Sequence, residues 1–200
     1  MAIEFKKTVF DGHTPEIWRG ECKMLPAGFK PVQSFPVDTV LHRGTPIYVD
    51  FEERTAAVCK TAKVVKGGTT TAFRVDKGHC FTVGDVVTKL GDGAATPTIS
   101  SIDTSNADYD VITLSASYTG LKEGDIVVES AAVSSGKATA KYTPNMVVGE
   151  DLHFTGRGIP TIDAAYEAVV LYPSLSFPIP SDWLNGCCLA KNPNILFIKQ

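Results

Sequence analysis

Turn-forming residues recur along this chain at intervals too short for long helices, and this spacing limits its fold more than any other feature. The 200 residues include 17 glycines and 12 prolines. Between these breaks, apolar and polar residues alternate. Ile47, Val49 and Phe51 form one such set, and Phe73 and Val75 begin another. Period-two alternation indicates half-buried strands, so the sequence predicts a mainly β protein.

The order of strands and connectors predicts three parts. Residues 1–57 are expected to form an N-terminal extended or β segment, and residues 58–135 a small β-barrel-like domain. Residues 136–200 form a C-terminal segment that packs on the N-terminal part or on a neighbouring subunit. The expected fold class is a small antiparallel barrel or sandwich with extended, Pro-rich N- and C-terminal segments. For residues 162–172 the composition fits helix and strand equally, and both stay open.

One short motif occurs twice, with its two copies forty residues apart. The first copy is Gly84-Asp85-Val86-Val87 and the second is Gly124-Asp125-Ile126-Val127. Solenoids need about three repeats, so we interpret the copies as equivalent turns of one barrel. Each glycine is expected to supply a positive φ or a bulge. Each aspartate is expected to bind nearby backbone amides rather than to serve acid–base chemistry.

The charge pattern argues against nucleic acid and membrane as partners. The net charge is −3, and the densest basic stretch, Lys60 to Lys66, holds only three lysines. We interpret these lysines as the solvent side of a strand, because a nucleic-acid-binding protein usually shows a basic face. No run of about 18 apolar residues exists to span a membrane, and Met1–Lys7 lacks the apolar region of a signal peptide.

Residues typical of catalysis or metal binding are present but not in the required patterns. The five cysteines (Cys22, Cys59, Cys80, Cys187 and Cys188) include no C-x-x-C pair, and we expect reduced, mostly buried thiols. His79 and Cys80 are adjacent, and adjacent strand residues face opposite sides, which argues against a nucleophile–base pair. Neither Gly67-Gly68 nor Gly156-Arg157-Gly158 matches a phosphate-binding loop. We therefore predict no catalytic residue, no metal site, no cofactor and no enzymatic activity.

Bulky apolar residues gather among prolines in the C-terminal segment. The candidate oligomer contacts are Tyr166, Tyr172, Leu175, Phe177, Ile179 and Trp183. These side chains pack either on their own domain or on another subunit, and the sequence leaves both open. Four aromatic residues are expected at the surface, where they could stack on sugars: Trp18, Tyr48, Tyr109 and Trp183. They support an alternative function as a carbohydrate- or ligand-binding β module.

Four stretches carry a resemblance to a known family: LHRGTPIYVDFEERTAAVCKTAKVV from Leu41, KGHCFTVGDVV from Lys77, YDVITLS from Tyr109 and NPNILFIKQ from Asn192. In these stretches the chain resembles head fibre and capsid-decoration proteins of tailed phages and prophages. The resemblance implies a structural, non-enzymatic virion protein, often a trimer. Its partners would be copies of itself, the major capsid protein and, in the alternative reading, surface glycans.

The same resemblance implies a location on the capsid surface, after synthesis in the cytoplasm of the bacterial host. Long fibres often carry a repetitive or coiled-coil shaft. This sequence has no heptad run, which favours a compact decoration module.

Overall fold

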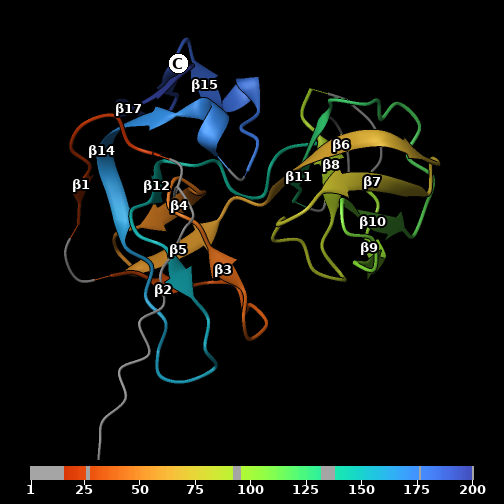
Figure 1. Ribbon diagram of the computed structural model, residues 1–200, viewed down its shortest axis with the longest axis horizontal. Coiled ribbons are helices and arrows are strands. Elements are labelled where there is room, and N and C mark those ends of the chain that lie inside the picture. Colours follow the sequence, from red (N-terminus) through yellow and green to blue (C-terminus); the bar gives the residue numbers. More distant parts are fainter. Residues whose placement is uncertain (1–15, 26–27, 92–95, 132–137, 176, 200) are drawn as a thin grey trace, which may run out of the picture.

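The computed structural model describes residues 16–25, 28–91, 96–131, 138–175 and 177–199, and these form two lobes of short β-strands (Figure 1). The helical pieces are two single 3-10 turns, η1 (Tyr172–Ser174) and η2 (Ser181–Trp183). The prediction of a mainly β fold is confirmed. Within the described ranges, no helix is long and apolar enough to cross a membrane.

The larger lobe contains a nine-stranded sheet with the order β15-β16-β17-β14-β12-β4-β5-β2, and β1 also pairs with β14. Its strands are β1 (Lys23–Met24), β2 (Lys30–Pro31), β4 (Pro46–Asp50), β5 (Thr55–Val58), β12 (Met146–Val148), β14 (Ala164–Leu171), β15 (Leu184–Asn185), β16 (Cys188–Leu189) and β17 (Asn192–Ile198). A separate two-stranded sheet joins β3 (Val40–Leu41) to β13 (Leu152–His153). The two ends of the sequence thus build one lobe.

Part of this sheet closes on itself. Phe29, just before β2, and Ile162, just before β14, exchange two backbone hydrogen bonds of 2.8 Å. The path β14-β12-β4-β5-β2 therefore returns to its start as a small barrel. Side chains on one face fill its interior, and those on the other face pack under the C-terminal strands. Along β12, Met146 and Val148 point inward, whereas Val147 joins the outer cluster.

The smaller lobe is a six-stranded sheet with the order β8-β11-β6-β7-β10-β9. Its strands are β6 (Thr61–Gly68), β7 (Ala72–Asp76), β8 (Val87–Lys89), β9 (Ile99–Asp103), β10 (Tyr109–Leu114) and β11 (Ile126–Glu129). A bridge between Val86 and Thr98 closes this sheet into a second barrel, and Ile99 N–H donates to the Asp85 carbonyl at 2.8 Å beside it. Closure removes the open edges at which sheets aggregate.

Shared side chains join the two barrels. Cys80 belongs to the loop after β7 but packs in the interior cluster of the larger lobe. Val128 of β11 packs in that lobe's outer cluster. Thr61 Oγ1 also donates a hydrogen bond of 2.8 Å to the Pro178 carbonyl. The junction is therefore a packed interface that includes apolar residues, not a bare linker.

Residues 162–172, which the sequence left open between helix and strand, form mainly strand. The stretch that fitted helix and strand equally contains the long strand β14, which ends at η1. β14 pairs with β12 and β17 as well as with β1, and such sheet pairing overrides a weak helix propensity. The last strand, β17, is not at an edge of the sheet, because it lies between β16 and β14.

Candidate functional site

The geometry around His79 and Cys80 offers no activated nucleophile. His79 Nδ1 accepts a hydrogen bond from the Phe81 amide at 3.2 Å, and its Nε2 lies 3.4 Å from Asp110 Oδ2. Burial lowers the pKa of His79, although the Asp110 carboxylate opposes this shift. Burial raises the pKa of Cys80 to about 12. Both imidazole nitrogens therefore face groups other than the thiol, and the thiol stays protonated at neutral pH.

The two copies of the repeated motif form matching turns. Asp85 Oδ2 accepts a hydrogen bond from the Thr82 amide at 2.7 Å, and Asp125 Oδ2 accepts one from the Lys122 amide at 2.8 Å. The preceding glycines have φ of 96° and 88°. The predicted local role of both aspartates and the predicted positive φ are confirmed.

Each motif aspartate also forms an ion pair with a lysine, and the first pair is more deeply buried than the second. Asp85 lies 2.7 Å from Lys60 Nζ, and these side chains are 12% and 4% exposed. Asp125 lies 2.9 Å from Lys89 Nζ, and that pair is 17% and 33% exposed. The prediction that Lys60 faces solvent is wrong, because the carboxylate of the first turn compensates its buried charge. Lys63 and Lys66 of β6 are exposed, as predicted.

The aromatic C-terminal segment fills the core of its own chain. Phe177 lies in the interior cluster, and Ile179 and Trp183 lie in the outer cluster, all nearly inaccessible. The expectation that Trp183 is exposed is wrong, because only 3% of it is accessible. The other candidate contacts, Tyr166, Tyr172 and Leu175, are partly buried against the same clusters. They retain surface that another subunit could contact.

The three remaining surface aromatics are not brought together. Trp18 forms an isolated antiparallel β-bridge with Val170 of β14. Tyr48 stacks on Tyr142, with ring centroids 6.1 Å apart. Tyr109 lies in the smaller lobe, where the Arg74 guanidinium carbon is 4.4 Å from its ring centroid. Because neighbours already cover a face of Tyr48 and of Tyr109, these rings form no shared stacking platform.

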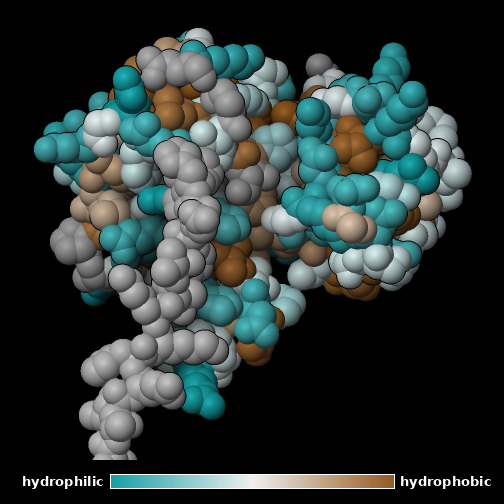
Figure 2. All heavy atoms as spheres, in the orientation of Figure 1, coloured by the Kyte–Doolittle hydropathy of each residue, from teal (hydrophilic) through white to brown (hydrophobic). Residues whose placement is uncertain are grey.

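Two exposed apolar side chains lie instead at a hollow in the larger lobe. The large apolar side chains with the greatest exposure among the described residues are Met24, Val32, Val37, Phe51, Val83 and Ile159. Two of them, Val37 and Ile159, line the hollow, and we call the hollow and its lining the end face. Figure 2 shows apolar atoms exposed among hydrophilic ones on the face in view.

Phe51, also strongly exposed, packs against Phe29. Its ring meets the Phe29 ring edge-on at 5.9 Å, and Phe29 pairs with Ile162, which follows the hollow's Thr161. The sequence pattern placed Phe51 on the same face as Ile47 and Val49. That expectation is wrong, because β4 ends at Asp50 and Phe51 lies in the exposed turn after it.

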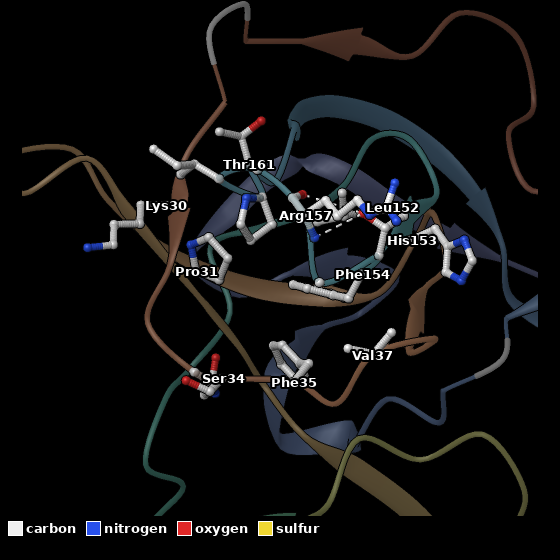
Figure 3. Close-up of a pocket in the computed structure, with 16 residues that line it drawn as sticks. Lys30, Pro31, Ser34, Phe35, Val37, Leu152, His153, Phe154, Arg157 and Thr161 are labelled. Atoms are coloured by element: carbon white, nitrogen blue, oxygen red, sulfur yellow. Dashed lines mark hydrogen bonds between the residues drawn. The ribbon is translucent and has the colours of Figure 1, made fainter.

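The hollow has a volume of about 510 Å³ and lies between two stretches of chain, residues 30–37 and 152–161. Phe35 and Phe154 meet inside it with ring centroids 5.0 Å apart. Figure 3 shows Phe35 and Val37 on one side of the space and Phe154 and Arg157 on the other. Apolar side chains thus line much of the hollow, together with polar and charged ones such as Ser34 and Arg157.

Gly156 lets one wall of the hollow, residues 152–161, lie close to the other wall, residues 30–37. Gly156 has φ of 70°, and a Cβ at this position would lie 2.9 Å from Val37 Cγ2. A side chain here would be strained by the backbone and would push against the opposite wall. Sequence reasoning noted Gly156-Arg157-Gly158 only as a failed phosphate-loop match. The bulky apolar Ile159 that follows these glycines was the sequence signal that it missed.

Within the described part of the chain, no group of three or more His, Cys, Asp or Glu side chains is placed to hold a metal ion. Comparison of the chain with protein-family models, curated proteins and solved structures finds no match. The end face is therefore interpreted from its own chemistry. Apolar groups around a hollow can bind and position a partner.

Proposed function

We propose that the chain is a structural protein of a phage or prophage virion, a head fibre or decoration protein that binds the capsid surface. The observation that carries the proposal is the end face, where the large exposed apolar side chains of Val37 and Ile159 line a hollow. Soluble monomers rarely expose such groups together unless the surface binds something. Its partner in this proposal is the major capsid protein.

The two-barrel architecture suits such a role. Both sheets close through backbone hydrogen bonds, which leaves few free edges on a protein displayed in many copies. The stretches that resemble decoration proteins supply strands and turns of both barrels, including the first of the matching turns. The resemblance therefore concerns residues that build the fold, as expected for a structural protein.

We propose a homotrimer, because capsid surfaces offer three-fold positions to closed symmetric assemblies. Tyr166, Tyr172 and Leu175 are the candidate contacts with surface left for a neighbouring copy. The alternative of a carbohydrate-binding module is less well supported, because Arg74 and Tyr142 already occupy ring faces of the candidate sugar-stacking residues.

The proposal is tested by sedimenting the protein with phage heads assembled without it. The added protein should have a mass of about 64 kDa by light scattering, three times the 21.4 kDa chain. The wild type should pellet with the heads, and Val37→Ser should bind about tenfold more weakly because it loses apolar area. The matched control is Val83→Ser, an equally exposed valine on the smaller lobe, which should bind as the wild type does. A wild type that stays in the supernatant, or two valine variants that bind equally, would contradict the proposal.

A further inference from the structure

The geometry points to a specific occupant of the hollow: an extended, acidic peptide segment that inserts apolar side chains between the two walls. This inference rests on the proposed function, and it specifies the chemistry of the capsid segment that is bound. Three observations carry it: the apolar interior, the sign of the charges at the rim and the placement of Arg157.

The interior accepts apolar side chains. The volume of about 510 Å³ falls within the range of roughly 300–1,000 Å³ typical of ligand sites. Phe35, Val37, Phe154 and Pro160 present carbon surfaces to it. Ile159, which is 82% exposed, would lose its contact with water when a segment covers the hollow.

Two charged residues line the hollow, and both are positive. They are Lys30 and Arg157, and among the described residues no aspartate or glutamate lines the space, although the whole chain has a net charge of −3. His153 Nε2 lies 3.6 Å from Asp38 Oδ1 at the surface. The ion pairs found among the described residues include neither Lys30 nor Arg157. Two cations are therefore available to carboxylates of a bound segment.

Arg157 is placed to bind a carboxylate. It lies between Gly156 and Gly158, whose φ values are 70° and 74°, and Thr155 Oγ1 lies 3.4 Å from both its backbone N and its O. Figure 3 shows Arg157 on the same side of the space as Phe154, and Lys30 at its edge with the amino group pointing outward. A planar guanidinium can bind a carboxylate with two parallel hydrogen bonds, which gives direction as well as affinity.

The same observations favour a peptide over a nucleic acid. Phosphate backbones are bound by rows of lysine and arginine, and binding weakens steeply with salt. Here a few cations surround apolar walls. A peptide that alternates apolar and acidic side chains satisfies both features, because its backbone is neutral and alternate side chains of an extended chain point to opposite sides.

The test uses the full chain and fluorescently labelled hexapeptide pools, read by anisotropy. In one pool two random apolar residues alternate with aspartate and glutamate. In a second they alternate with lysines, and in a third two serines replace the apolar residues between the acidic ones. The acidic–apolar pool should bind at least tenfold more tightly than either other pool. Equal binding of the acidic and basic pools would overturn the inference.

Single-residue variants then test whether Arg157 and Lys30 bind the acidic residues of the peptide. Arg157→Gln should weaken binding of the acidic–apolar pool about tenfold, and Lys30→Gln about threefold. The matched control is Lys63→Gln, which removes an exposed lysine of β6 in the smaller lobe and should change nothing. Displacement of the pool by millimolar inorganic phosphate would reveal a general anion site and overturn the peptide inference, as would unchanged binding by Arg157→Gln.

The failure of this inference is distinguishable from that of the proposed function. If heads retain the wild type but the acidic–apolar pool does not bind, the acidic segment is wrong and the capsid role stands. If the pool binds and heads do not retain the protein, the hollow binds acidic peptides but the capsid role is wrong.

Discussion

Replacing Trp183 by alanine should lower the free energy of unfolding by about 3–5 kcal/mol, the usual range for a buried tryptophan. Trp183 is 3% exposed and packs with Val170, Ile195 and Phe197 on the outer face of the larger barrel. Its carbonyl also accepts a hydrogen bond of 2.8 Å from the Ala190 amide. The loss should appear as a lower urea midpoint with an unchanged slope.

The matched control is the other tryptophan. Trp18 is only partly buried against the same cluster, so Trp18→Ala should cost about 1–2 kcal/mol. Equal losses would contradict the packing described for the C-terminal segment.

The same packing means that deletion of residues 172–200 would unfold the larger lobe, since β17 and the buried aromatics would be lost. Such a truncation therefore does not report on oligomerisation.

Replacing Asp85 by alanine should destabilise the protein by about 3–5 kcal/mol, because it leaves the Lys60 ammonium buried without a counter-charge. Nζ of Lys60 lies 2.7 Å from Asp85 Oδ2 and 3.4 Å from Thr82 Oγ1. The Lys60 side chain is only 4% exposed, so water cannot replace the lost carboxylate. The change also removes the hydrogen bond that Asp85 accepts from the Thr82 amide. Urea unfolding is the measurement here as well.

The second copy of the motif provides the control. Asp125→Ala removes the equivalent turn hydrogen bond, but Lys89 is about one-third exposed, so we expect a loss of about 1–2 kcal/mol. The double variant Lys60→Met with Asp85→Leu should recover most of the loss of Asp85→Ala. Equal effects at Asp85 and Asp125, or no recovery in the double variant, would show that burial of the ion pair is not the cause.

Local patterns in the sequence were sufficient to predict the strands and the matching turns. The alternating residues Ile47 and Val49 lie in β4, and Phe73 and Val75 lie in β7. The Gly-Asp pairs take the expected turn conformation. These features depend on neighbours along the chain, which a single sequence displays directly. The mainly β fold follows from them.

Features that depend on distant partners were not predictable in the same way. Burial of Lys60 requires Asp85, and assignment of β14 as a strand requires pairing with strands from both ends of the chain. The end face combines Val37 with Ile159, more than a hundred residues apart. The pairing of β3 with β13, beside which Asp38 N–H donates to the Phe154 carbonyl, brings their two stretches of chain together at one hollow.

The capsid role is tested most directly by quantitative mass spectrometry of density-purified virions from a phage that encodes this chain. The account predicts that the chain is present in many copies per particle, in a fixed ratio to the major capsid protein, and that protease treatment of intact particles removes it. Its presence only in the infected-cell lysate, with none on purified particles, would contradict the account.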